Sequence, residues 1–269
     1  MNSAPIGVFD SGLGGLTSVK RLLRLLPNED VIYLGDTGRV PYGTRSRETI
    51  IKYARQDVQF LQNHGVKTII IACNTVSAVA AQSLLPELNI PVFEVVAPPS
   101  AEAARLTKNG RIGVIGTSAT IKSGAYEAAL RAINSGLFIT SAACPLLVPL
   151  VENGRTDADD VAAQTIVRDY LDPLMREGID TLVLGCTHYP LLRDVIVKVA
   201  GPDIMLVDSG AVTAEFAAKQ LRELNLLSGK AAAGEARFYV TDSTEGFEAA
   251  AVAFLEKDVS GNVFKTTLE

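Results

Sequence analysis

The sequence predicts an α/β protein of two pseudo-symmetric halves, each with a doubly wound parallel sheet, and an active site in the cleft between them. Short β-branched runs alternate with stretches whose apolar residues recur at helical spacing. The segments GVKTIIIACNTVSAV (65–79) and GIDTLVLGCTHYPLL (178–192) match at an offset of 113 residues. The segments PIGVFDSG (5–12) and RIGVIGTS (111–118) match at an offset of 106. Two such echoes in one order indicate an internal repeat.

The expected strands are apolar along their whole length, which is typical of strands covered by helices on both faces. They are Ile6–Phe9, Val31–Leu34, Thr68–Ala72, Val92–Val95, Ile112–Ile115, Thr181–Leu184 and Ile204–Val207. Helical periodicity predicts helices over Leu16–Leu26, Ser46–Gly65 and Asp157–Glu177.

Two prolines after Ala97 predict a hinge, because they interrupt the strand–helix pattern. The return crossing is expected near Asp208, where VDSG echoes FDSG at the first strand. We therefore expect residues 1–97 with 208–269 to form the domain of Cys73, and residues 98–207 to form the domain of Cys186. The alanine-rich stretch 231–236 is interpreted as a surface connection.

Composition excludes several classes of protein. The chain of 269 residues has 48% hydrophobic residues and a net charge of -5. It has no basic stripe for nucleic acid, no apolar run for a membrane span and no signal-peptide pattern, so a cytoplasmic protein is expected. We interpret two basic groups as solvated helix or loop faces, namely Lys20–Arg24 and the group Arg39, Arg45 and Arg47. A local anion-binding site is the alternative.

Metal and disulfide chemistry are not expected. Three cysteines without a CxxC pair do not form a disulfide framework. His64 and His188 are the only histidines, too few for a structural zinc site.

A glycine-rich turn follows the first strand. Asp10-Ser11-Gly12-Leu13-Gly14-Gly15 opens the first helix, where backbone N–H groups favour an anion such as a carboxylate. The turn lacks the residues of a P-loop and the spacing of GxGxxG, so it is a poor nucleotide motif. The alternative is a tight turn with no ligand.

The repeated cysteines are the candidate catalytic pair. Cys73 and Cys186 each follow a strand at the edge where open parallel sheets bind ligands. If the halves face each other, the two thiols meet across one cleft, which suits removal of a proton from one face of a substrate and its return to the other. Cys144 has no partner in the repeat and is interpreted as structural.

Four other groups are candidates for acid–base chemistry. His188, two residues after Cys186, could orient that thiol or exchange its proton. Asp10, Asp36 and Glu152 lie at or near expected loops, and each could instead be a helix cap or a solvated carboxylate.

Four motifs, in this order and spacing, carry a resemblance to a known family. They are FDSGLGGLTSVKRL, GDTGRVPYGTRS, IIIACNTVSA and LVLGCTHYPLL. The chain resembles glutamate racemases of the cofactor-independent aspartate/glutamate racemase superfamily from Pro5 to about Gly210. The resemblance implies that the protein racemises glutamate without a cofactor or metal. It also implies that the protein supplies D-glutamate for peptidoglycan synthesis. The expected partner is the small-molecule substrate glutamate, with no nucleic acid and no membrane. A homodimer is a possible assembly.

The resemblance also implies roles for individual residues. Cys73 would take the proton from D-glutamate and Cys186 from L-glutamate, and the groups that would tune these thiols are Asp10, Asp36, Glu152 and His188. The residues implied in substrate contact are Asp10, Ser11, Pro41, Tyr42, Gly43, Asn74, Thr75, Thr187 and His188.

Three alternatives remain open. A thiol redox protein would use the same cysteines, although separate strand ends and the absence of CxxC argue against it. A non-catalytic module for a small anion would use the glycine turn but gives no reason for duplicated thiols. An aspartate-specific racemase differs from a glutamate racemase by one methylene of pocket length, which no motif reports.

Overall fold

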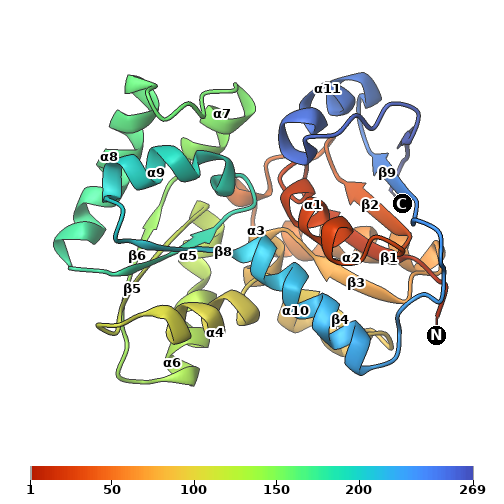
Figure 1. The fold of residues 1–269 in the computed structure, drawn as a ribbon, viewed down its shortest axis with the longest axis horizontal. Helices are drawn as coiled ribbons and strands as arrows, with labels where there is room; N and C mark the ends of the chain where they lie inside the picture. The colour runs from red at the N-terminus through yellow and green to blue at the C-terminus, as the bar shows by residue number, and fades with distance from the viewer. Residues whose placement is uncertain (1, 269) are drawn as a thin grey trace.

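Residues 2–268, which the computed structural model describes, form two parallel sheets with helices on both faces (Figure 1). The first sheet has six strands in the order β10-β9-β2-β1-β3-β4. They are β1 (Ile6–Asp10), β2 (Val31–Gly35), β3 (Thr68–Ile71), β4 (Val92–Glu94), β9 (Ala236–Val240) and β10 (Val263–Lys265). The second has four strands in the order β6-β5-β7-β8. They are β5 (Arg111–Gly116), β6 (Phe138–Ala143), β7 (Thr181–Gly185) and β8 (Met205–Asp208).

The two sheets share one four-stranded plan. The order β2-β1-β3-β4 in the first corresponds to β6-β5-β7-β8 in the second. Ile6 lies opposite Thr68 in the first sheet, and Ile112 lies opposite Thr181 in the second. These two pairs are related by the offsets of 106 and 113 residues found in the sequence. The predicted pair of related parallel-sheet halves is therefore confirmed.

Helices cover both faces of each sheet. In the first half, α1 (Leu16–Leu25), α10 (Ser209–Glu223) and α11 (Thr244–Leu255) share one core, and α2 (Arg47–Asn63) and α3 (Asn74–Leu84) share the other. In the second half, α7 (Leu147–Glu152), α8 (Val161–Arg176) and α9 (Arg193–Ala200) lie on one face, and α4 (Ala97–Leu106) and α6 (Ala125–Ile133) lie on the other. The short helices are α5 (Ser118–Ser123), η1 (Tyr42–Thr44), η2 (Leu85–Glu87) and η3 (Tyr189–Leu192).

The core beneath α1 in the first half and the core beneath α7, α8 and α9 in the second half form one continuous cluster. Leu16 and Leu22 of the first half are in the same buried cluster as Leu171 and Leu184 of the second. Because this cluster runs through both halves, the edges of the two sheets that carry the candidate residues are held near each other.

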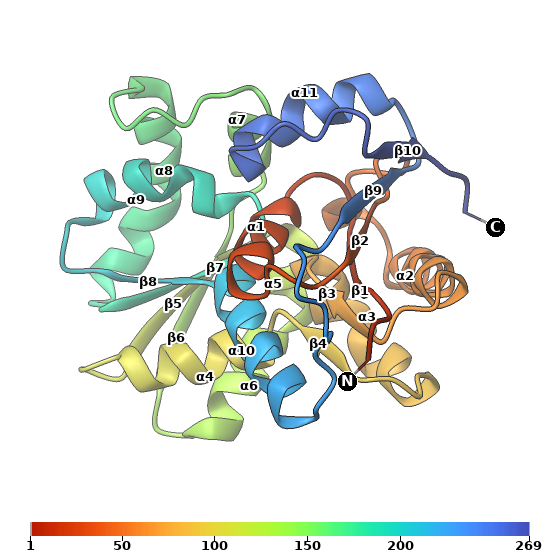
Figure 2. The same ribbon diagram turned by 45° about the vertical axis from the view of Figure 1, so that its right-hand side comes forward.

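Three strands were not expected from the sequence. β6 is a half-exposed edge strand, so it lacks the continuous apolar character of the central strands. β9 and β10 come from the last part of the chain and extend the first sheet beyond β2, as Figure 2 shows.

We expected the two prolines after Ala97 to interrupt the strand–helix pattern. In the structure they do not interrupt it. They lie in the first turn of α4, where a missing N–H costs nothing and the fixed φ of proline suits a helix. The membership of the strands supports our proposed domains, residues 1–97 with 208–269 and residues 98–207.

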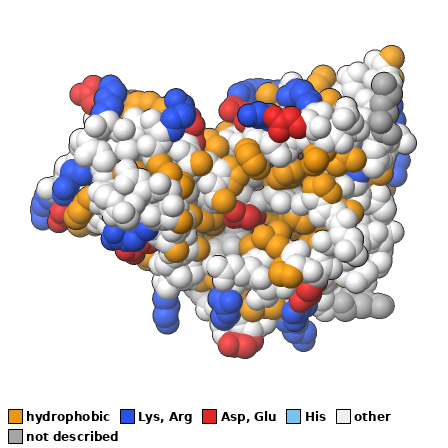
Figure 3. Space-filling view, turned by 90° about the horizontal axis from the view of Figure 1, so that it is seen from below, with side chains coloured by type: hydrophobic (Ala, Val, Ile, Leu, Met, Phe, Trp, Pro, Cys, Tyr) orange, Lys and Arg blue, Asp and Glu red, His pale blue; other side chains and the backbone are white. Residues whose placement is uncertain are grey.

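The side of the molecule that carries α4, α6 and α10 exposes a group of apolar side chains (Figure 3). A groove of about 680 Å³ between α4 and α10 is lined there by Pro98, Val212 and Phe216. No helix within residues 2–268 has the length and hydropathy needed to cross a membrane.

Candidate active site

The carboxyl ends of strands from both sheets meet at one cavity of about 240 Å³. Most of the residues predicted to contact substrate or to transfer protons line it, namely Ser11, Pro41, Tyr42, Gly43, Cys73, Asn74, Thr75, Glu152, Cys186, Thr187 and His188. Cys73 comes from the first sheet and Cys186 from the second, so the structure brings the two thiols to one space. Asp10 and Asp36 do not line the cavity.

Cys73 lies at the junction between β3 and α3, where it is the N-cap residue of the helix. Its thiol donates to Ser11 Oγ at 3.5 Å, and its side chain is almost fully buried. Burial, followed by the nearby carboxylate of Asp10, raises the pKa of Cys73 to about 12, although backbone N–H groups of Val76 and Ser11 oppose this shift. At neutral pH Cys73 is therefore a thiol that can give a proton.

Cys186 has a different neighbourhood. Its Sγ lies 4.0 Å from His188 Nδ1, and His188 Nε2 lies 3.1 Å from Glu152 Oε1. Burial disfavours a charged imidazole, but the contacts with Cys186 and Glu152 outweigh it and raise the pKa of His188 to about 10. At neutral pH the ring is thus an imidazolium, which places a positive charge beside Cys186 Sγ. The two thiols therefore have different electrostatic surroundings.

Asp10 lies below the cavity floor at the end of β1. It is fully buried, and its Oδ2 accepts a hydrogen bond from Gly12 N at 2.9 Å, while Oδ1 has no partner among the described residues. Burial raises the pKa of Asp10, and the positive charge of His188 acts in the opposite direction. Asp10 therefore lies outside the cavity wall, and its charge contributes to the raised pKa of Cys73.

Asp36 lies behind Tyr42, away from both thiols. Its carboxylate accepts hydrogen bonds from the Tyr42 hydroxyl, from Arg39 Nε at 2.5 Å and from Thr241 Oγ1 at 2.8 Å. The structure therefore gives this residue a contact with the cavity wall and none with a cysteine.

Asn74 and Thr75, which follow Cys73, bridge the two halves. Asn74 Nδ2 donates to Tyr126 Oη at 2.8 Å and to Ser209 Oγ at 3.1 Å. Thr75 Oγ1 lies 2.9 Å from Thr117 Oγ1. These hydrogen bonds hold the polar residues beside Cys73 in place against the second half.

Sequence reasoning placed Gly12 in the anion-binding turn but missed several other residues of the cavity wall, namely Val40, Thr44, Thr117, Ser118, Pro145, Val148 and Pro149. The repeat carries a signal for two of them, because the offset of 106 residues pairs Ser11 with Thr117 and Gly12 with Ser118. The residues of α7 have no counterpart in the repeat, and only the fold brings them to the cavity.

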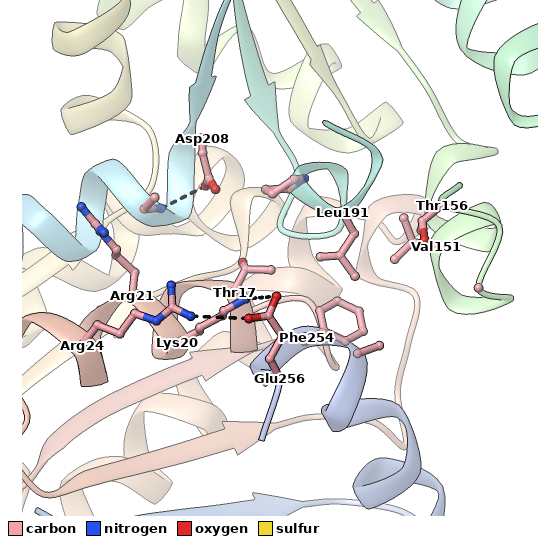
Figure 4. A pocket seen from close by; sticks show the side chains of 14 residues that line it. Thr17, Lys20, Arg21, Arg24, Val151, Thr156, Leu191, Asp208, Phe254 and Glu256 are labelled. Atoms are coloured by element: carbon pink, nitrogen blue, oxygen red, sulfur yellow. Dashed lines mark hydrogen bonds and ion pairs between the residues drawn. The ribbon is translucent and has the colours of Figure 1, made fainter. Parts of the chain in front are cut away.

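A second cavity, of about 450 Å³, is lined by Thr17, Leu191 and Phe254 (Figure 4). Phe254 of α11 lines it and presents an edge-to-face contact to His188, with ring centroids 5.7 Å apart. Glu256, just after α11, pairs with Lys20 and Arg24 of α1 (Figure 4). The end of α11 therefore packs against the imidazole and is anchored to α1.

The cavity is lined by several hydrogen-bonding groups. Residues 2–268 contain no group of three His, Cys, Asp or Glu side chains arranged to hold a metal ion. Ser11, Thr75 and Thr187 line the cavity together with Asn74, the first residue of α3. Such an arrangement favours a carboxylate ligand and can stabilise negative charge that develops on it.

Comparison with known proteins identifies a family and its relatives. Residues 6–217 match the family model described as Asp/Glu/hydantoin racemase. The chain is 46% identical over 264 residues to a glutamate racemase from Geobacter metallireducens, with 98% of this chain and 97% of the relative covered. It is 46% identical over 252 residues to one from Neisseria meningitidis serogroup A, with coverage of 93% and 92%.

Solved structures agree with these relatives. A glutamate racemase from Bacillus anthracis superposes with a TM-score of 0.95 at 39% identity, covering 100% of this chain and 99% of that one. A glutamate racemase from Francisella tularensis, solved in complex with D-glutamate, superposes with a TM-score of 0.93 at 38% identity and the same coverage.

Proposed function

This chain belongs to the Asp/Glu/hydantoin racemase family, and from that premise we propose that it interconverts L-glutamate and D-glutamate with two cysteines as acid and base. The observation that supports the proposal is the meeting of Cys73 and Cys186 at one cavity, where Cys73 lies beside Ser11 and Cys186 lies beside His188. The printed names of the relatives, and the D-glutamate complex of one of them, support glutamate as the substrate.

The reaction from L-glutamate begins with the Cys186 thiolate. It removes the α-proton, and the electron pair of the broken C–H bond stays on the α-carbon and spreads onto the α-carboxylate. Cys73 then gives its thiol proton to the opposite face of that carbon, which produces D-glutamate. Cys186 is now a thiol and Cys73 a thiolate, so the reaction from D-glutamate runs through the same groups in reverse.

The α-proton of an amino acid is very weakly acidic, so the site must stabilise the carbanion-like state. We assign this role to donors aimed at the α-carboxylate, from the hydroxyls of Ser11, Thr75 and Thr187 and from backbone N–H groups beside them. Asp10 contributes to the raised pKa of Cys73, and we assign to His188, held by Glu152, the role of a positive charge beside Cys186.

The high pKa of Cys73 argues against the alternative of a thiol redox protein, because reactive redox cysteines carry thiolates at neutral pH.

Incubation of the purified protein with L-glutamate and L-aspartate in separate reactions, followed by circular dichroism, tests the proposal. We expect loss of optical activity with glutamate only. Loss with aspartate alone would overturn the substrate assignment, and loss with neither would overturn the activity.

We further propose a cytoplasmic role in which D-glutamate is supplied for peptidoglycan synthesis, as the family resemblance implies. Deletion of the gene in its own organism tests this role. Growth that depends on added D-glutamate is the expected result, and normal growth with an intact cell wall and no other source of D-glutamate would contradict it.

A further inference from the structure

A buried polar cluster lies behind the wall of the cavity. It consists of Asp36, Arg39, Tyr42, Asp57 and Thr241. Asp57 is on α2, whose other buried residues are apolar, and both aspartates are fully buried. A carboxyl group at such a position is costly unless its hydrogen bonds are satisfied, so the partners of Asp57 indicate why it is there.

The hydroxyl of Tyr42 lies between the two carboxyl groups. It contacts Asp36 Oδ2 and lies 3.2 Å from Asp57 Oδ2. A phenol has one proton, so it can donate to only one of them. The other contact is a hydrogen bond only if that carboxyl is itself protonated and donates to the tyrosine oxygen.

The remaining partners decide which carboxyl holds the proton. Asp36 accepts from Arg39 Nε at 2.5 Å and from Thr241 Oγ1 at 2.8 Å, and both contacts favour a carboxylate. Within residues 2–268, the side chain of Asp57 has besides Tyr42 only a contact of 3.3 Å with Arg39 Nη2. Burial, followed by the negative charge of Asp36, raises the pKa of Asp57 well above its usual range. The proton therefore resides on Asp57.

These bonds form a directed chain. Asp57 donates to Tyr42, Tyr42 donates to Asp36, and Asp36 is paired with Arg39. The chain fixes the ring of Tyr42, and the segment 40–44 around it contributes five neighbouring residues to the cavity wall. Asp57 itself does not line the cavity.

We propose that Asp57 is a positioning residue for substrate binding, which acts by donating a hydrogen bond to Tyr42 and so holding segment 40–44 at the cavity. The inference rests on the proposed function, since the substrate held by this wall is taken to be glutamate. It commits to a neutral donor at residue 57 and not to a second negative charge.

Two substitutions separate these roles. Asp57→Asn keeps a donor for Tyr42 and an acceptor for Arg39 without a charge, whereas Asp57→Leu removes both. We expect Asp57→Asn to stay within about threefold of the wild-type KM for glutamate, and Asp57→Leu to raise KM about tenfold or more with kcat within about threefold. Interactions made equally in the ground state and the transition state change KM and leave kcat in place.

Val58→Ala is the matched control, because it removes apolar packing from the buried face of the same helix and leaves the cluster intact. It should lower Tm without a change in KM. A wild-type KM in Asp57→Leu would overturn the proposal, and an equal rise of KM in Asp57→Asn and Asp57→Leu would overturn the neutral donor.

A readout independent of activity covers a failure of Asp57→Leu to fold. The readout is the carbon-13 NMR signal of the Asp57 carboxyl in the full wild-type chain labelled at aspartate carboxyls. This signal is assigned as the one that Asp57→Asn lacks. At neutral pH it should have the chemical shift of a protonated acid. A signal that titrates in the ordinary carboxyl range would overturn the proposal. A wild-type protein inactive with glutamate would instead refute the proposed function, and the titration would still decide where the proton of the cluster resides.

Discussion

Gly14 of one half lies so close to Thr187 of the other that a β-carbon at residue 14 would come within 2.1 Å of Thr187 Oγ1. The same β-carbon would lie 2.6 Å from His188 Nδ1, the atom that faces Cys186. The absence of a side chain at Gly14 therefore permits the close approach of the two halves beside the His188 imidazole. This contact gives Gly14 a role beyond the tight turn.

We accordingly predict that Gly14→Ala lowers kcat/KM for glutamate by about a hundredfold, because Thr187 and His188 must move to admit the methyl group. Gly246→Ala is the control, since a β-carbon there would meet only ordinary contacts of 3.5 and 3.7 Å with Ser243. It should keep wild-type kinetics. Steady-state assays of both variants, with circular dichroism to verify folding, check the prediction, and a fully active Gly14→Ala would refute it.

The cysteines should divide sharply in a serine scan. Cys73→Ser and Cys186→Ser should each lose at least about a thousandfold in kcat without unfolding, because a serine hydroxyl is a far weaker acid than a thiol. Cys144→Ser should keep most of its activity, since Cys144 is buried in the core outside the cavity. Near-normal turnover in either of the first two variants would remove the two-base assignment.

The pH profile should depend on Glu152. Because the contact with Glu152 helps to raise the pKa of His188 to about 10, Glu152→Gln should lower that pKa and move the alkaline limb of kcat/KM to lower pH. A raised pKa also stabilises the fold below the usual pKa of histidine, and this contribution is lost as pH rises through about 10. The Tm difference between wild type and Glu152→Gln should therefore shrink at high pH. An alkaline limb of kcat/KM at the same pH in both proteins would contradict the role of Glu152 in raising the pKa of His188.

The two thiols should respond to different neighbours. His188→Asn should lower kcat from L-glutamate more than Asp10→Asn does, whereas Asp10→Asn should weigh more on the reaction from D-glutamate. The equilibrium constant between enantiomers is unity, so kcat/KM must fall equally in both directions. The asymmetry can therefore be seen only in kcat and KM separately, or in deuterium isotope effects from each side. Identical isotope-effect patterns in both variants would show that the division of roles is wrong.

The repeat was enough to predict the fold class and the pairing of Cys73 with Cys186, because strand register preserves sequence offsets. The same offset could have located Thr117, which corresponds to Ser11. It could not place Glu152 against His188, or Asp57 against Tyr42, because those contacts join elements that have no sequence relation and depend on how helices pack on the sheets. β9 was missed for the same reason, since its partner β2 lies about two hundred residues earlier in the chain, and β10 joins the sheet only through β9.

The most direct test of the two-base account is the fate of the α-proton when L-glutamate is converted in deuterated water. Early in the reaction, the account predicts that D-glutamate carries deuterium at the α-carbon while the remaining L-glutamate keeps its protium, because different thiols remove and return the proton. Proton NMR of the separated enantiomers measures both values. D-glutamate that retains the original protium would show that one group serves both faces, and would contradict the account.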